Sequence, residues 1–252
     1  KNMDLKFADN IVFISETDSS NNYANRQLTD GEVLEGTVFL AYSQVSGRGQ
    51  MDNIWESEAG ENLTFSLVLK PVFLEIQDQF LLSKVVTLGI FSVLNSYVEG
   101  ITIKWPNDIY AGNKKLGGIL IENSIMSGRI TNSIIGIGLN INQERFFSTA
   151  PNPVSLKQIT GKTFELIPLL KQILLEIEKY YQMLKDGNTP WINDFFENIM
   201  YRFGEDHRYI HDGKQFVGRI IGVNKIGQLL IVDSDKKIRQ FHFKEVEFVL
   251  NS

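Results

Sequence analysis

Basic and acidic side chains at close spacing in the segment 104–122 could position anionic substrates. Lys104 ends one apolar run, Asp108 comes four residues later, and Lys115 precedes a second apolar run. Proline has no backbone N–H for a sheet ladder, so Pro106 predicts that the first strand ends there or lies at a sheet edge. The side chains that follow, Asp108 among them, are then displayed at a strand end, where a ligand could meet them.

A polar cluster at residues 17–23 follows the apolar run 11–14. Its hydroxyl and amide residues, including Ser19, Ser20 and Asn21, are typical of a helix N-cap. They could also bind a polar ligand, because a helix N-terminus presents several backbone donors at once. The two interpretations are compatible.

A long loop at residues 43–55 carries an arginine between two glycines. Glycines let the backbone wrap an anion, and Arg48 would supply the charge. An ordinary surface loop would use the same tripeptide. The length of the loop and Trp55 near its end favour a loop that becomes ordered over a ligand.

Glycines at alternate positions mark the end of the apolar run 130–142. Gly136 and Gly138 remove two side chains from one face of the predicted strand, and Asn140 continues that face. The pattern predicts a slot beside the sheet, a β-bulge or a close helix contact.

The composition excludes several classes of site. The 252 residues contain no Cys, which excludes a thiol nucleophile, a disulfide framework and a thiolate metal site. The three histidines, His207, His211 and His242, all follow residue 204. Catalysis elsewhere must use Lys, Arg, Asp, Asn and backbone donors, which suits the positioning of anions.

The charge and hydropathy pattern indicates the cellular setting. The formal net charge is −5, which gives no basic footprint for nucleic acid. The N-terminus has no apolar signal region, and no apolar run reaches the ~18 residues that a membrane span needs. We expect a cytoplasmic protein that binds neither nucleic acid nor membranes.

The periodicity of apolar residues predicts a chain that contains both strands and helices. Strands are expected at 11–14, 37–42, 62–69, 101–104, 119–121 and 130–142, and helices at 79–98, 155–160, 166–184 and 190–200. The helix at 79–98 is apolar nearly all round and should be buried. Short strands at 216–223, 228–232 and 238–243 predict a small all-β domain at 204–252 behind a catalytic domain at 1–200.

Five blocks of the chain, in order, resemble the biotin protein ligases, which share a fold with the lipoate protein ligases. The blocks are Asp18–Tyr23, Gln44–Trp55, Lys104–Asp108, Lys115–Glu122 and Gly136–Asn140. Each block alone is a weak signal, but five in the family's order over essentially the whole chain are specific. The resemblance implies an α+β fold, in which a mixed or antiparallel sheet with packed helices forms a class II synthetase-like ligase domain. It also implies a small C-terminal β-barrel. It implies the ligase-only form, because no DNA-binding domain precedes residue 10.

The resemblance also implies a two-step reaction. The family joins biotin and ATP, with Mg²⁺, into biotinyl-5′-AMP and pyrophosphate, and then transfers the biotinyl group to a lysine of a biotin carboxyl carrier protein domain. The implied catalytic residues are Lys115, Arg48 and Asp108. The implied biotin contacts are Ser19, Ser20, Asn21, Gln44, Gly47, Arg48, Lys115, Gly118 and Gly136. The implied ATP contacts are Gln50, Trp55, Asn107, Lys115 and Asn140.

Two roles in this cluster are hypotheses about individual residues. Asp108 would orient the acceptor lysine and take its proton. Lys104 would either hold Asp108 in an ion pair or contact the ligand directly. No residue is implied as a metal ligand, and a homodimer is among the expected assemblies.

The loop departs from the family's pattern, which often has a second arginine and a final glycine where this chain has Gln50-Met51-Asp52-Asn53. Fewer cations predict weaker retention of the adenylate. The alternatives are a lipoate ligase, which the Lys104–Asp108 block disfavours, and a biotin-binding module without ligase activity, to which the altered loop points.

Overall fold

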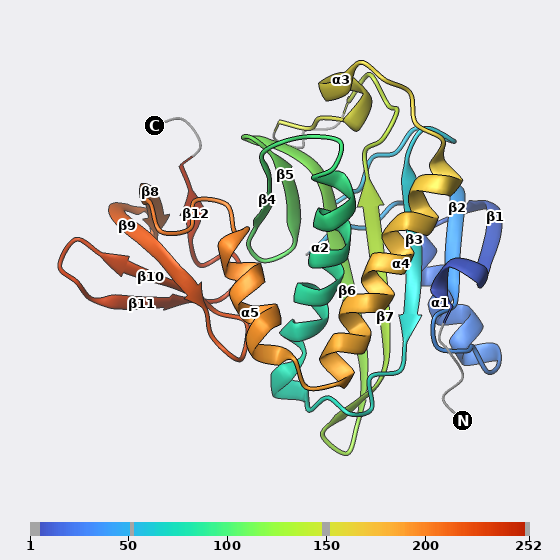
Figure 1. Cartoon of the computed structure of the whole chain (residues 1–252), viewed down its shortest axis with the longest axis horizontal. Coiled ribbons are helices and arrows are strands. Elements are labelled where there is room, and N and C mark those ends of the chain that lie inside the picture. Colours follow the sequence, from blue (N-terminus) through green and yellow to red (C-terminus); the bar gives the residue numbers. More distant parts are fainter. Residues whose placement is uncertain (1–5, 51–52, 148–151, 250–252) are drawn as a thin grey trace.

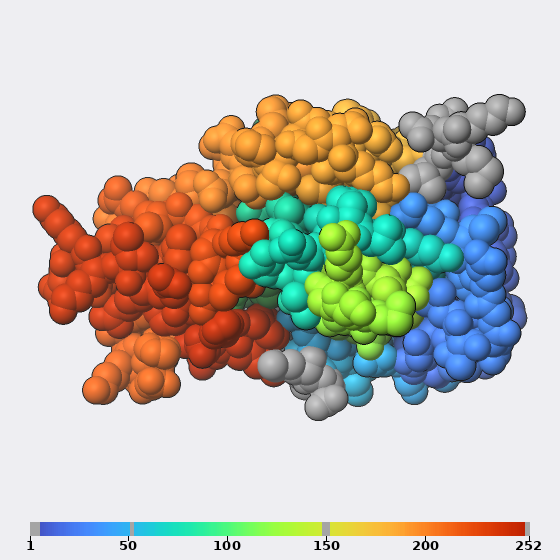
Figure 2. Space-filling model, turned by 90° about the horizontal axis from the view of Figure 1, so that it is seen from below, coloured from blue at the N-terminus to red at the C-terminus, as the bar shows by residue number. Residues whose placement is uncertain are grey.

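The computed structural model describes residues 6–50, 53–147 and 152–249. A seven-stranded sheet with helices on both faces is followed by a smaller five-stranded sheet (Figure 1). The C-terminal sheet lies at one end of an elongated molecule, and the N-terminal strands of the main sheet lie at the other (Figure 2).

The main sheet has the strand order β1-β2-β3-β7-β6-β5-β4. Its strands are β1 Ile11–Thr17, β2 Val38–Gln44, β3 Leu63–Leu69, β4 Ile101–Lys104, β5 Asp108–Ala111, β6 Lys114–Met126 and β7 Arg129–Leu139. β1 runs parallel to β2 and the other neighbours are antiparallel. The expected mixed sheet is therefore confirmed. β4 ends at Lys104, as Pro106 predicts, and Gly112 turns the chain into β6 with a φ of 56°.

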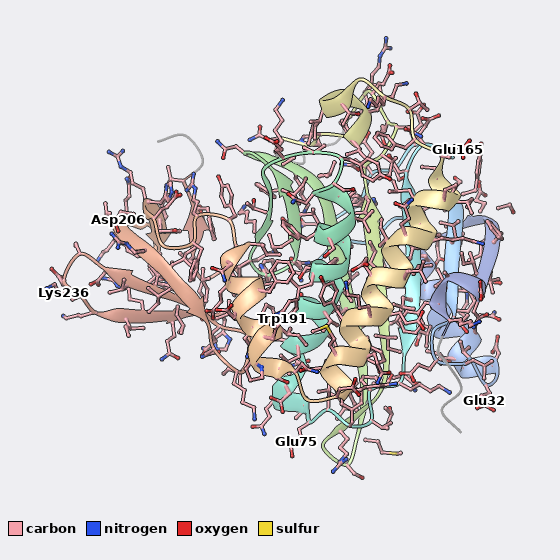
Figure 3. All side chains as sticks on the ribbon, in the orientation of Figure 1. Glu32, Glu75, Glu165, Trp191, Asp206 and Lys236 are labelled. Atoms are coloured by element: carbon pink, nitrogen blue, oxygen red, sulfur yellow. The ribbon has the colours of Figure 1, made fainter. Side chains whose placement is uncertain are left out.

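Two long helices, α2 Phe80–Leu94 and α4 Leu166–Lys185, pack together over one face of the sheet (Figure 1). Eleven of the fifteen residues of α2 are buried, as its all-round apolar sequence predicts. A second core cluster, which includes Ala24 of α1 Ser20–Asp30, lies beneath α1. The remaining helices are η1 Phe7–Asp9, η2 Ile76–Asp78, α3 Leu156–Thr160 and α5 Thr189–Asn198. Trp191 of α5 stacks on Tyr180 of α4, with ring centroids 5.9 Å apart (Figure 3).

The C-terminal unit is an open sheet in the order β11-β10-β9-β8-β12. Its strands are β8 Asp206–His211, β9 Lys214–Val223, β10 Leu229–Asp233, β11 Ile238–Phe241 and β12 Glu247–Phe248. The expected small β-domain is present, but its β-barrel is not closed, because within the described part of the chain the edge strands β11 and β12 do not pair with each other. The sequence pattern missed β8, which is mostly polar, and β12, which has two residues.

Lys84 is a buried cation between α2 and α5. Its side chain is 4% exposed, and Nζ donates to Oδ1 of Asn193 at 2.8 Å. The ring of Phe196 lies 5.2 Å from Nζ. Burial lowers the pKa of Lys84 from 10.5 to about 8. Since the folded pKa lies below the unfolded value, the charged lysine destabilises the fold below about pH 8. That penalty is relieved as the pH rises toward 10.5.

We therefore expect Lys84→Met to raise the free energy of unfolding at pH 7 by about 1–3 kcal/mol. Urea unfolding from pH 7 to 9 would measure this, and the parent alone should gain stability over that range. Lys179→Met, at an exposed lysine of α4, is the control. Parallel stability curves for the parent and Lys84→Met would contradict the expectation.

Candidate functional site

A cavity of about 1020 Å³ lies where the main sheet meets the C-terminal sheet. Its walls come from the α1 N-terminus, the loop 48–56, the β4–β5 connection, β6, β7 and the segment 243–248. Of the residues that the sequence nominated, the following line it: Ser19, Ser20, Asn21, Gln44, Arg48, Gln50, Trp55, Asn107, Asp108, Lys115, Gly118, Gly136 and Asn140. Gly47 does not. Residues as far apart in the chain as Ser19 and Asn140 thus meet in one space large enough for a nucleotide and a second small molecule.

Lys115 and Asp108 form an ion pair in the wall of this cavity. Lys115 Nζ lies 2.8 Å from Asp108 Oδ1, and both side chains are about a quarter exposed. A register shift between β5 and β6 brings Lys115 opposite Tyr110. A Cβ on Gly118 would lie 3.5 Å from Asp108 Oδ1, from Lys115 Cε and from the Trp55 ring, so Gly118 lies directly beside the pair. A cation and a carboxylate therefore face the cavity together.

Lys104 does not hold Asp108, and that alternative is wrong. Its Nζ donates to the hydroxyl of Tyr110 at 3.2 Å and lies 5.1 Å from the rings of Tyr110 and Phe248. Burial lowers its pKa, while Asp108 acts in the opposite direction. In the β4–β5 register Lys104 lies directly opposite Asp108, but its Nζ binds Tyr110 instead. The register shift in β6 places Lys115 on the face of β5 that carries Asp108, and Lys115 forms the ion pair. Lys104 lines the cavity, so direct contact with a ligand stays open.

Arg48 is held at the rim of the cavity by Glu122 and Asn22. Its Nη2 lies 3.0 Å from Glu122 Oε1, and Nη1 donates to Asn22 Oδ1 at 2.7 Å. The loop folds back on itself, because the backbone N–H of Trp55 donates to the Gly47 carbonyl at 2.9 Å. A Cβ on Gly47 would lie closer than 3.0 Å to the Trp55 carbonyl oxygen, so this fold requires glycine there. Met51 and Asp52 lie outside the described residues, and the effect of the altered loop stays a prediction.

The N-cap interpretation of residues 17–23 is confirmed. Ser19 accepts a hydrogen bond from the Asn22 backbone N–H at 3.1 Å and begins α1. The next backbone N–H, that of Ser20, donates to Oε1 of Gln44 at 2.7 Å. Asn21 donates to Glu122 Oε2 at 2.7 Å. The cap thus also turns hydroxyl and amide groups toward the cavity.

The two alternating glycines of β7 leave space that side chains fill. A Cβ on Gly136 would lie closer than 3.0 Å to the amide oxygen of Asn21. A Cβ on Gly138 would lie closer than 3.0 Å to three ring atoms of Trp55. The predicted slot beside the sheet therefore exists, and the side chains of Asn21 and Trp55 occupy it. Lys115 Nζ lies 5.9 Å from that indole ring.

Three buried polar atoms at the cavity have no partner within the described residues. They are Trp55 Nε1, Asn140 Oδ1 and Gln50 Oε1. A buried polar group without a partner costs about 1–3 kcal/mol, so such groups mark a place where a ligand supplies the partner. Asn107 differs, because its amide nitrogen binds the Ile119 carbonyl and braces β6.

The sequence pattern nominated no individual residue of the C-terminal sheet for the site. Phe243, Lys244 and Phe248 line the cavity, and Trp105 Nε1 donates to the Gly227 carbonyl at 2.9 Å. No local signal marks these residues, because only the docking of the two sheets brings them to the site. The buried Ser66 was also missed, although a serine in an apolar strand is a visible signal.

The histidines take no part in this site. His207 and His211 both lie on β8, and His207 Nε2 is 2.9 Å from Glu205. Within the described ranges, no group of three His, Asp or Glu residues could hold a metal ion. No helix in those ranges is long and apolar enough to span a membrane.

Gly138→Ala should displace Trp55, because the new methyl group would overlap the indole ring. We expect a rise of about tenfold or more in the concentration of an adenine nucleotide needed for half-saturation, from a lost stacking contact worth ~1–3 kcal/mol. Tryptophan fluorescence and nucleotide titration would measure it. Gly31→Ala is the control, since nothing lies within 4 Å of its added Cβ. Parent-like titration of Gly138→Ala would contradict the expectation.

Comparison with known proteins gives three consistent results. Residues 13–140 match the family model described as "Biotin/lipoate A/B protein ligase family". The chain is 31% identical over 238 residues to the "Bifunctional ligase/repressor BirA" of Bacillus spizizenii, covering 91% of this chain and 71% of that protein. It is 26% identical over 227 residues to the Escherichia coli protein of the same name, covering 88% and 68%.

A solved structure agrees with the sequence matches. The biotin protein ligase from Aquifex aeolicus, in complex with biotin and ATP, superposes with a TM-score of 0.78 and 27% identity, over 94% of this chain and 97% of that one. The family model spans just over half of the described fold and includes the α1 cap, the arginine loop and the Lys115–Asp108 pair. The chain belongs to the biotin/lipoate A/B protein ligase family.

Proposed function

We propose that this protein is an ATP-dependent biotin protein ligase, with residues 1–200 as the catalytic domain and 204–252 as a small domain that closes one side of the site. The observation that carries the proposal is the meeting of Lys115, Asp108 and Arg48 with unpartnered polar groups in one cavity. Relatives named as biotin ligases, and a solved relative in complex with biotin and ATP, support biotin and ATP as the substrates.

In the first step, a biotin carboxylate oxygen attacks the α-phosphorus of ATP, and the bond to the leaving pyrophosphate breaks. Both reacting groups are anions, and two unit charges ~4 Å apart repel by ~4 kcal/mol at an effective dielectric of 20. Lys115 and Arg48 would offset this repulsion, because both present positive charge at the cavity wall. Their contribution is electrostatic positioning, without a covalent bond to the protein.

Trp55 and Asn140 would receive the adenylate portion. The indole lies on Gly138, and its Nε1 lacks a partner, as does Asn140 Oδ1. An adenine ring could stack on the indole, and the amide oxygen could accept from the nucleotide. Ser20 and Gln44 would bind the ureido ring of biotin at the other end of the cavity.

In the second step, the amine of an acceptor lysine attacks the biotinyl carbonyl carbon, AMP leaves, and the attacking nitrogen loses a proton. At pH 7 a lysine with its reference pKa of ~10.4 costs ~4.6 kcal/mol to deprotonate. Asp108 would orient this amine and take its proton, since its carboxylate faces the cavity.

Mg²⁺ would arrive as the partner of the ATP phosphates. The described residues offer no cluster of three metal-ligating side chains, and Mg²⁺ is commonly held by phosphates, waters and one or two carboxylates. Asp108, Glu56 and Glu247 are the carboxylates in the lining. When bound, the ion would neutralise phosphate charge.

The acceptor is proposed to be a carrier domain of a biotin-dependent carboxylase in the cytoplasm. The test measures biotin-dependent exchange of pyrophosphate into ATP, and then the gain of one biotinyl group by a purified carrier domain. Both signals are expected with biotin and neither with lipoate. Biotin binding without exchange would support a binding module instead, and turnover with lipoate alone would support a lipoate ligase. Gel filtration would test the expected homodimer.

A further inference from the structure

Ser66 is a fully buried serine in β3 that connects two residues of the proposed biotin pocket. Its hydroxyl lies 2.8 Å from Ser20 Oγ and 2.6 Å from Asn21 Oδ1, and its side chain is 0% exposed. It lies opposite Gly136 in the β3–β7 register. Ser66 itself does not line the cavity, whereas Ser20 and Asn21 do.

The direction of the hydrogen bonds in this cluster follows from the chemistry of the groups. Asn21 Nδ2 donates to Glu122 Oε2 at 2.7 Å and to the Leu120 carbonyl at 3.3 Å. A carboxylate and a carbonyl can only accept, so the amide nitrogen must face them. The amide oxygen then faces Ser66 and can only accept.

The single proton of Ser66 is therefore committed to Asn21. The contact between Ser66 and Ser20 then requires Ser20 to donate, because a hydroxyl has one proton. Ser20 Oγ is left with lone pairs toward the cavity. Gln44 uses its amide oxygen for the Ser20 backbone N–H at 2.7 Å, and its amide nitrogen has no hydrogen bond within the described residues.

We propose that Glu122, Asn21 and Ser66 form a relay of positioning residues that fixes Ser20 as an acceptor toward the cavity, next to the Gln44 amide donor. Such a pair selects a ligand that presents an N–H beside a C=O, as a cyclic urea does. This inference rests on the proposed biotin substrate and assigns the specificity to side chains behind the pocket wall.

The test compares binding of biotin with binding of biotin methylated at either ureido nitrogen, by calorimetry without ATP. Ser66→Ala frees the Ser20 hydroxyl to rotate, so its affinity for biotin should fall about threefold to tenfold. Binding of at least one methylated compound, which lacks the N–H, should change less. The ratio of the affinity for biotin to the affinity for that methylated compound should therefore be smaller in Ser66→Ala than in the parent. The biotin KM for adenylate formation should rise while kcat changes little.

Ser133→Ala is the matched control. Ser133 is also 0% exposed in the main sheet, and it donates to Asn123 Oδ1 at the same 2.6 Å, outside the relay. It should show parent-like affinities and a comparable loss of thermal stability. Glu122→Gln probes the relay from its other end, because a neutral amide oxygen accepts a weaker hydrogen bond from Asn21 Nδ2 than a carboxylate does. Glu122→Gln should also lower the ratio of the affinity for biotin to the affinity for methylated biotin.

The outcomes separate the two proposals. A parent protein that does not bind biotin overturns the proposed function. A parent that binds biotin, with unchanged affinity ratios in both Ser66→Ala and Glu122→Gln, overturns the relay alone.

Discussion

Lys115→Ala is expected to lower the rate of adenylate formation by about 10²- to 10³-fold, the loss that removal of one preorganised electrostatic contact produces. Lys115 Nζ lies 2.8 Å from Asp108 and close to the face of Trp55, so its charge stands where the carboxylate and α-phosphate would meet. Biotin-dependent pyrophosphate exchange would measure the effect. Binding of biotin alone should weaken much less, because the repulsion between the two anions develops only when both are present.

Lys114→Ala is the control for this experiment. Lys114 is the preceding residue of the same strand and is exposed away from the cavity. It should retain parent activity, so that a loss in both variants would indicate damage to β6. Exchange at the parent rate in Lys115→Ala would contradict the proposed catalytic role.

Asp108→Asn should separate the two chemical steps. We expect adenylate formation to change little, because the neutral amide leaves Lys115 and its positive charge in the cavity wall. Transfer to the carrier lysine should fall by about 10²- to 10⁴-fold, the usual contribution of a general base. Single-turnover transfer from preformed adenylate, measured between pH 7 and pH 10, would test this. The difference in transfer rate between the parent and Asp108→Asn should become smaller as the pH rises, since more of the acceptor amine is then neutral.

Asp206→Asn is the control for the carboxylate. Asp206 pairs with Arg219 at 2.9 Å on the C-terminal sheet (Figure 3) and does not line the cavity. It should transfer at the parent rate. If Asp108→Asn both forms and transfers adenylate normally, the base hypothesis is wrong.

Local sequence patterns predicted most elements because their signals are local. Apolar periodicity marks α2 and α4, proline ends β4, and the serine at position 19 caps α1. The boundaries moved by a few residues where helix ends met loops, as at α2. The expected β-barrel proved to be an open sheet, because closure depends on which strand edges meet, and that contact is not encoded in any one strand.

The sequence predicted which residues form the candidate site, but it did not predict which of them contact each other. The five blocks nominated Lys115, Asp108 and Arg48, and the structure brings these to one cavity. The pairing of Asp108 with Lys115, not with Lys104, depends on a register shift between β5 and β6. Register is set by the pairing of strands across the sheet, so residue spacing alone could not decide it.

The sequence by itself determined the chemistry available to this protein. Without Cys, and with no His before residue 204, it left basic groups, carboxylates and amides to act on anions. Only the tertiary structure decided which side chain packs against each glycine. It also decided that the C-terminal sheet closes the cavity with Phe243 and Phe248. It also decided the direction of the hydrogen bonds through Ser66. These depend on contacts between residues far apart in the chain, whose free energies arise only when the sheet and helices pack together.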